Sequence, residues 1–292
     1  IANYSSNEEL LAKLQAGASG YDLAVPSDYM VLAMSKLGLL QELDHSKLKN
    51  TKDLDPKLMK RPFDPTNRYS LPYDWGTTGI AINRALYKGQ MKGWKDLFGN
   101  PQLAGKFTLL DDARETLGAA LKASGFSLNS VGAAELEKAK QLLLKYRKDV
   151  KAFTSEPTVP LSHGETAVAH AYVSDSLQAR KAGAQIEYIV PEEGCTLWID
   201  NWVIPKRGSH VDEAHQFIDF LLEPKNAVMT TEAVFVSPAN RQVFALLPKE
   251  LQKDSALFPT TAQISKCEAM QDLGDKLTLW DRIWTEIKAR AE

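Results

Sequence analysis

The chain of 292 residues contains only two cysteines, Cys195 and Cys267, and it lacks any long apolar run. The spacing of 72 positions between the cysteines excludes a CxxC redox or zinc motif. Two independent thiols are one interpretation, and a single disulfide is the other if the protein is exported. No run approaches the roughly 18–20 apolar residues that span a membrane, so the sequence predicts no transmembrane helix.

An excess of charge of either sign is also missing. The 35 basic and 37 acidic residues give a net charge of −2, and the lysines and arginines are scattered along the chain. A nucleic-acid-binding protein needs a concentrated basic patch, so no nucleic-acid partner is expected. Hydrophobic residues make up 44% and charged residues 25%, which is ordinary for a globular protein long enough to form one large domain or two lobes.

Signatures of catalysis are absent as well. The segment from Gly99 to Gly105 has one residue too many for a phosphate-binding loop, and no GxSxG or HExxH motif occurs. His163 and His170 are seven positions apart, which on a helix separates them by two turns and excludes a shared metal. We therefore expect no enzyme activity, metal or cofactor. A hydrolase or transferase on an α/β fold is the alternative of a different class, and no nucleophile–base pair indicates one.

Short apolar strands alternate with amphipathic helices, and this alternation predicts an α/β fold. Residues 40–68 are polar, contain prolines and have no sustained period, which indicates a long surface connection. The expected helices are 6–14, 27–38, 112–122, 133–146, 211–222, 225–233 and 271–290, and the expected strands are 22–26, 69–73, 77–82, 106–110, 166–173, 186–190 and 197–204.

Acidic residues recur beside aromatic ones. Asp112 and Glu115 stand three positions apart where a strand becomes a helix, so both can lie on one face of the first turn. The pair is also a capping box, and both roles are compatible because one carboxylate oxygen can cap while the other faces a ligand. Tyr172 and Asp175 form a similar pair at a strand end, with a helix cap as the structural alternative.

Strand alternation places Trp198, Asp200 and Trp202 on one face. An unpaired buried carboxylate is costly, so an acid between two indoles suits a site whose cation comes from outside. The alternative is that Asp200 pairs with a local lysine or arginine. A linear polyamine fits such a composition, because its ammonium groups need carboxylates and its methylenes need flat apolar walls that also attract cations.

Several motifs carry a family resemblance. They lie at 21–29 (Tyr-Asp-Leu-Ala-Val-Pro-Ser-Asp-Tyr), 69–76 (Tyr-Ser-Leu-Pro-Tyr-Asp-Trp-Gly), 110–115 (Leu-Asp-Asp-Ala-Arg-Glu), 191–194 (Pro-Glu-Glu-Gly), 198–200 (Trp-Ile-Asp) and 217–224 (Phe-Ile-Asp-Phe-Leu-Leu-Glu-Pro). In this order the chain resembles the periplasmic spermidine/putrescine-binding proteins of bacterial ABC transporters. The resemblance covers nearly the whole chain.

The resemblance implies a two-lobed periplasmic-binding-protein fold of the type II-like clamshell kind, with strands crossing between the lobes and the ligand cleft between them. Residues 1–77 and 199–246 are expected to form lobe 1, and 78–198 and 247–292 to form lobe 2. Hinge closure over the ligand is implied. The ligand-binding positions that carry over are Ser27, Tyr29, Asp112, Glu115, Tyr172, Asp175, Trp198, Asp200, Phe235 and Met270.

Three departures from the family bear on the ligand. Phe235 stands at a tyrosine position and loses a hydroxyl, and Met270 stands at a glutamine position unless Gln271 substitutes after a shift of one residue. The family also begins with a strand and an aromatic-rich loop that supply part of the pocket, and we expect this chain to begin after them. From that expectation we predict that the first lobe and its pocket are incomplete. The alternatives are a non-binding fragment and a domain-swapped form.

The resemblance also implies the biological setting. We expect a periplasmic or otherwise extracytoplasmic, monomeric protein whose signal peptide has been removed, either free or anchored to the membrane through an N-terminal region. A polyamine is the expected ligand, and the membrane permease of an ABC importer is the expected partner. Another small cationic or organic solute in the same fold is the alternative. Cys195 and Cys267 fall close to the hinge and pocket of the family, which favours the disulfide more than spacing alone does.

Overall fold

The computed structural model describes residue 4 and residues 6–289, which form two compact units. Unit 1 comprises Ile1–Gly76 and Trp198–Asp254, and unit 2 comprises Thr77–Leu197 and Ser255–Glu292. The chain passes between the units inside β1 (Ser70–Asn83), at the start of β6 (Thr196–Val203) and after α11 (Lys249–Gln252). Each unit is described by itself below.

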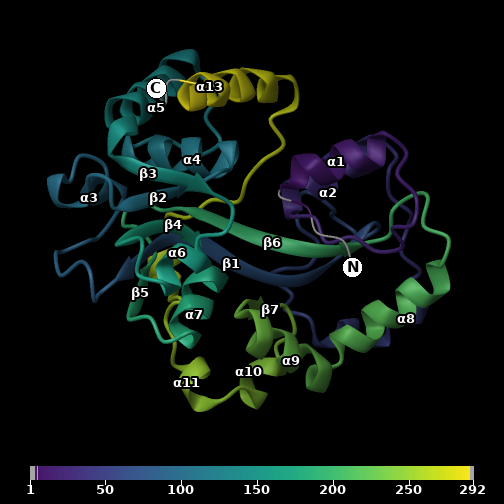
Figure 1. Ribbon diagram of the computed structural model, residues 1–292. Helices are drawn as coiled ribbons and strands as arrows, with labels where there is room; N and C mark the ends of the chain where they lie inside the picture. Colours follow the sequence, from purple (N-terminus) through teal and green to yellow (C-terminus); the bar gives the residue numbers. More distant parts are fainter. Residues whose placement is uncertain (1–3, 5, 290–292) are drawn as a thin grey trace. The chain divides into compact units, whose positions relative to one another are not determined.

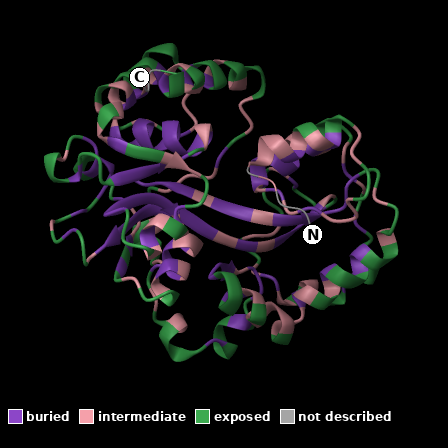
Figure 2. Cartoon of the chain, viewed as in Figure 1, coloured by how far each residue is buried: buried purple, intermediate pink, exposed green. Residues whose placement is uncertain are grey.

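Unit 2 is built on a sheet whose central strands are almost wholly buried. The strand order is β3 (Val150–Thr154), β2 (Phe107–Leu110), β4 (Val168–Tyr172), β1 and β5 (Ile186–Ile189). The β2 strand is parallel to β3 and β4, whereas β1 is antiparallel to β4 and β5. Because helices cover both faces, every residue of β2 is buried (Figure 2).

Helices α4 (Ala113–Ala123), α5 (Ala133–Tyr146) and α13 (Leu277–Ala289) lie on one face of this sheet, and α6 (Thr158–Ser162) and α7 (Val173–Lys181) lie on the other (Figure 1). The apolar stripe of α5 supplies the buried Leu136, Ala139 and Leu143. The remaining elements of unit 2 are α3 (Trp94–Leu97), η3 (Pro101–Leu103), η4 (Arg147–Asp149), α12 (Thr261–Ile264) and η5 (Gly274–Lys276).

Unit 1 packs its helices around the first half of β1 and most of β6. Its core contains Leu48, Leu71, Ile204 and Ile218, which are at most 2% exposed. The elements are α1 (Asn7–Gln15), α2 (Asp28–Lys36), η1 (His45–Lys47), η2 (Lys49–Asp53), α8 (Val211–Leu222), α9 (Pro224–Val234), β7 (Ser237–Pro238), α10 (Val243–Leu246) and α11. Both β6 and β7 pair with β1.

The structure confirms the α/β class and corrects four of the expected elements. Residues 69–73 and 77–82 are parts of the single strand β1, because backbone pairing with β7 carries the strand through Asp74 and Trp75. Residues 22–26 form no strand and make one isolated bridge, between Ala24 and Val203. The helix expected at 271–290 begins at Leu277, and residue 290 lies outside the described residues.

One tight turn in unit 2 fixes the segment that precedes β6. Gly194 has a φ of +91°, and a Cβ built there would lie 1.9 Å from the carbonyl oxygen of Lys266. A side chain therefore meets both backbone strain and a clash with main chain.

We expect Gly194→Ala to lower the free energy of unfolding by about 2 kcal/mol or more. Gly183→Ala is the matched control, because Gly183 has a φ of +98° and a Cβ added at that position would have no other atom within 4 Å. Chemical denaturation of both variants checks this, and equal losses of stability would contradict the contact with Lys266.

Candidate functional site

A carboxyl-rich site in unit 2 lies where β2 passes into α4. Asp112 is the N-cap of α4, and its Oδ1 accepts a hydrogen bond of 3.0 Å from the backbone N–H of Glu115. The capping interpretation is therefore correct for Asp112. It leaves the carboxyl group of Glu115 free to point away from the helix end.

The Glu115 carboxyl group is buried among neutral donors. The hydroxyls of Thr78 and Thr196 donate to its two oxygens at 2.9 and 2.7 Å. Its residue is 4% exposed, and burial followed by the negative charge of Asp112 raises its pKa to about 8. Glu115 thus holds a proton near neutral pH unless a cation arrives.

His170 is adjacent to this carboxyl group, with Nε2 at 4.0 Å from Oε2 of Glu115. Burial lowers the pKa of His170 to about 3, so the ring is neutral and the contact is no ion pair at neutral pH. Within the described residues, neither ring nitrogen of His170 has a hydrogen-bond partner. The Arg114 side chain donates to the carbonyl of Gln271 and to Asn129.

A second carboxyl site occurs in unit 1 at β6. Asp200 and Ser27 face each other in an antiparallel bridge, and the Ser27 hydroxyl donates to Oδ1 of Asp200 at 2.6 Å. The position of Ser27 is fixed in turn by Asn7, which exchanges two hydrogen bonds with it at 3.0 and 3.1 Å. Burial raises the pKa of Asp200 to about 6, although the hydrogen bond from Ser27 opposes that rise.

Asp200 has no local cationic partner. In the part of the chain that the structure describes, no lysine or arginine lies within salt-bridge distance of Asp200 or Glu115. The alternative that Asp200 pairs with a local base is therefore not what the structure shows. Asp200 also lines a cleft of about 820 Å³ within unit 1, together with the aromatic residues Tyr4, Tyr73, Trp202 and Phe217. A solute can reach this carboxyl group.

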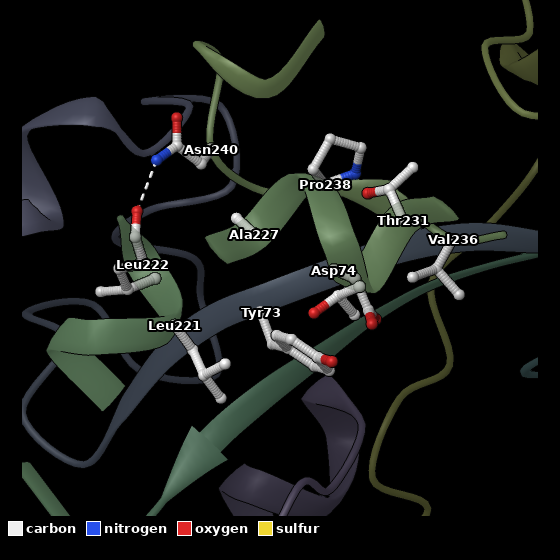
Figure 3. Close-up of a pocket in the computed structure, with 10 residues that line it drawn as sticks. Tyr73, Asp74, Leu221, Leu222, Ala227, Thr231, Val236, Pro238 and Asn240 are labelled. Atoms are coloured by element: carbon white, nitrogen blue, oxygen red, sulfur yellow. Dashed lines mark hydrogen bonds between the residues drawn. The ribbon is translucent and has the colours of Figure 1, made fainter. Parts of the chain in front are cut away.

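Asp74 is a buried acid of unit 1 that sequence reasoning did not identify. It is 5% exposed, and among the described residues its Oδ1 accepts no hydrogen bond. Burial and the negative charge of Asp200 raise the pKa of Asp74 well above its usual value. Figure 3 shows Asp74 on β1 beside Tyr73, facing Thr231 and Val236 across a cavity of about 10 Å³. The sequence signal was available, since Asp74 is the only acidic or basic residue in the segment 70–83.

The other predicted positions of unit 1 are buried, namely Tyr29, Trp198 and Phe235. Tyr29 is buried in α2, and its hydroxyl donates to Oε1 of Glu8 at 2.9 Å. Trp198 is 8% exposed at the start of the unit-1 part of β6. Phe235 is also 8% exposed and ends α9 in the left-handed conformation, with a φ of 58°.

The remaining predicted positions of unit 2 are Tyr172, Asp175 and Met270. Asp175 accepts from the Thr158 hydroxyl at 2.9 Å and from the backbone N–H of Tyr172 at 3.3 Å, so it caps α7. Burial raises the pKa of Asp175 to about 6. Met270 is buried beyond the short parallel bridge between Thr196 and Glu268. Direct contacts thus join Ser27 to Asp200, Asp112 to Glu115 and Tyr172 to Asp175.

Each unit thus contains an acid whose hydrogen-bond donors among the described residues are hydroxyl groups, namely Asp200 in unit 1 and Glu115 in unit 2. A sequence model of the bacterial extracellular solute-binding protein family matches residues 2–260, and the chain belongs to that family. It is therefore a solute-binding protein that acts outside the cytoplasm. Within its described residues, no helix is both long and apolar enough to cross a membrane.

Curated relatives of the chain are named as binding proteins for spermidine, putrescine or cadaverine. The chain is 37% identical over 291 residues to the spermidine/putrescine-binding periplasmic protein of Salmonella typhimurium, covering 99% of this chain and 83% of that protein. It is 35% identical to the putrescine/cadaverine-binding protein of Pseudomonas aeruginosa, covering 98% and 85%. The solved spermidine/putrescine ABC transporter substrate-binding protein PotD of Streptococcus pneumoniae is similar with a TM-score of 0.86 and 32% identity, covering 98% and 89%.

Proposed function

We propose that this chain captures a polyamine of the spermidine/putrescine class outside the cytoplasm and delivers it to the membrane permease of an ABC importer. It does so as a monomer, without catalysis, metal or cofactor. The names of the similar proteins support the ligand class. The observation that carries the proposal is that Glu115 and Asp200 are shielded carboxyl groups whose hydrogen-bond donors are hydroxyls, with no lysine or arginine in salt-bridge distance and with the neighbouring His170 uncharged.

Such groups are unfavourable in the unliganded protein. A carboxylate removed from water needs a cation or several donors, and without them it takes up a proton. A linear polyamine supplies cations and a flexible apolar chain at the same time. Its ammonium groups replace the protons on the carboxyl groups, and charge-assisted hydrogen bonds then form in a dry environment.

Each predicted residue has a proposed role in this scheme. In unit 2, Glu115 and Asp112 are proposed to bind an ammonium group. In unit 1, Asp200 is proposed to bind an ammonium group, with Asp74 adding negative charge near it. The remaining positions contact the methylene chain or position the acids, namely Ser27, Tyr29, Tyr172, Asp175, Trp198, Phe235 and Met270. Phe235 and Met270 lack the polar groups found at these positions in the family, so they are proposed to set the preference among ligands.

Polyamine affinity should rise with pH between about 6 and 8. The pKa of Glu115 is raised to about 8, so between pH 6 and 8 its site holds a proton that a cation displaces, whereas Asp200, with a pKa of about 6, is mostly ionised in this window. The displaced Glu115 proton makes the dissociation constant fall by up to about tenfold per pH unit below pH 8. Titration calorimetry in phosphate and in Tris measures the protons released at pH 7. A flat affinity with no proton release would contradict the role of these carboxyl groups.

A thermal-shift panel tests the ligand class itself. Spermidine, putrescine and cadaverine are compared with amino acids, opines and sugars at one concentration. The proposal predicts that the polyamines raise the melting temperature most. A larger shift with a sugar or an anionic solute would assign the chain to another ligand class within the same family.

A further inference from the structure

Two thiols in unit 2 lie in contact although they are 72 positions apart. The Sγ atoms of Cys195 and Cys267 are 3.2 Å from each other. Cys195 is 2% exposed, whereas Cys267 is only partly buried. The pair therefore combines a shielded sulfur with one that solvent can reach.

Backbone pairing holds the two residues in register. Glu268 donates its N–H to the carbonyl of Cys195 at 2.9 Å, and Leu197 donates to the carbonyl of Glu268 at 2.9 Å. Thr196 and Glu268 form a parallel bridge, so Cys195 and Cys267 occupy neighbouring positions on the two paired segments. Adjacent strands lie about 4.8 Å apart, which is within the Cα separations that a disulfide spans.

The surroundings make the two sulfurs chemically unequal. The hydrogen bond from Cys195 lowers the pKa of the Cys267 thiol, and the nearby Lys122 ammonium group acts in the same direction. Burial raises the pKa of Cys195 well above its usual value. Lys122 is itself fixed by Glu268 at 2.7 Å and by the carbonyl of Lys266 at 3.2 Å. Cys267 is thus the nucleophile that meets an oxidant first.

We propose that Cys195 and Cys267 are a redox modification site that closes to a disulfide by exchange with a disulfide-bearing oxidant outside the cytoplasm. The Cys267 thiolate attacks one sulfur of the oxidant, forms a mixed disulfide and releases one thiolate. The sulfur of Cys195 then attacks Sγ of Cys267 and releases the second thiolate. The two protein thiols are oxidised, the oxidant is reduced to two thiols, and the protons of the cysteines pass to the released thiolates.

The disulfide would fix residues that belong to the carboxyl site of unit 2. Thr196 follows Cys195 directly and donates to Glu115, and Met270 lies three positions beyond Cys267. Closing a loop of this length reduces the freedom of the unfolded chain, so oxidation should raise the melting temperature by several degrees. This inference depends on the two sulfurs and their setting, and it does not depend on the identity of the ligand.

Oxidised glutathione is the probe that tests the mechanism on the whole chain. The reduced wild-type protein should lose both thiols, become lighter by two hydrogens and retain no glutathione in its intact mass. The variant Cys195→Ser should instead retain one glutathione on Cys267, because the resolving sulfur is missing. The variant Cys267→Ser should retain little or none, since Cys195 is buried.

Thiol counts under native and denaturing conditions, with circular dichroism, show that each variant is folded, and Cys195→Ala serves if the serine is not tolerated. Two glutathione adducts on the wild-type protein, two persistent thiols after oxidation, or failure of folded Cys195→Ser to trap the adduct would each overturn the proposal. Polyamine calorimetry on the reduced protein tests the proposed function separately.

Discussion

Replacing Asp200 by asparagine should weaken spermidine binding by roughly 10- to 150-fold at neutral pH, because a hydrogen bond to a charged group contributes about 1.5–3 kcal/mol. Asparagine keeps the shape of the side chain and an acceptor oxygen for the Ser27 hydroxyl, which donates to Asp200 at 2.6 Å. Because burial raises the pKa of Asp200 to about 6, removing its charge should leave the melting temperature at neutral pH unchanged or higher, and not lower. Titration calorimetry and thermal unfolding of the same preparation measure both quantities.

Glu213→Gln is the matched control for this substitution. Glu213 is an exposed acid of α8 in the same unit, and its replacement removes one negative charge from the chain without touching the bridge between Ser27 and Asp200. The control should leave affinity unchanged. Asp200→Ala should lower affinity much more than it lowers the melting temperature. Unchanged binding in both Asp200 variants would remove this residue from the site.

Glu115→Gln should have effects of opposite sign on binding and on stability. Affinity should fall by at least about tenfold, because the amide cannot pair with an ammonium group as a carboxylate does. The unliganded protein should become more stable at pH 8. Glutamine retains polar atoms for the hydroxyls of Thr78 and Thr196, whose rotation allows each to donate or to accept.

The direction of the stability change follows from the pKa of Glu115, which is about 8 in the folded chain against 4.5 as its ordinary value. Between these values the folded state holds more protons than the unfolded state, so wild-type stability falls as pH rises through this window. The loss is on the order of a few kcal/mol by pH 8. Unfolding of both proteins at pH 5 and pH 8 provides the check, with the difference confined to the higher pH. A variant less stable than wild type at pH 8 would show that the charge serves the fold and not a ligand.

The sequence alone was sufficient to predict the helices whose apolar residues repeat at regular helical spacing. The expected helices 133–146 and 211–222 coincide with α5 and α8, because their apolar residues repeat at helical spacing and each faces a core. The strand β3 was missed. It pairs only with β2, and its exposed Lys151 and Ala152 interrupt the apolar pattern of a buried strand.

The same holds for the site: acids marked by a local motif were predicted, whereas an acid that depends on the tertiary structure was not. Asp112 and Glu115 were identified because their spacing within one helical turn is a local feature. Ser27 and Asp200 were predicted separately from the family motifs, and only the structure shows that they pair. Asp74 was missed because the segment around it was interpreted as a turn between two strands. Its importance comes from burial on β1 and from the charge of Asp200, neither of which sequence spacing reveals.

The central claim is that buried carboxyl groups without a lysine or arginine partner bind an elongated cation. Calorimetric titration of the chain with putrescine and with butane-1,4-diol, at pH 7.5 in two buffers, tests this most directly. The diol has the same carbon chain and no charge. The account predicts that putrescine binds with release of protons while the diol does not bind. Equal binding of the two compounds, or no binding of putrescine and spermidine, would contradict it.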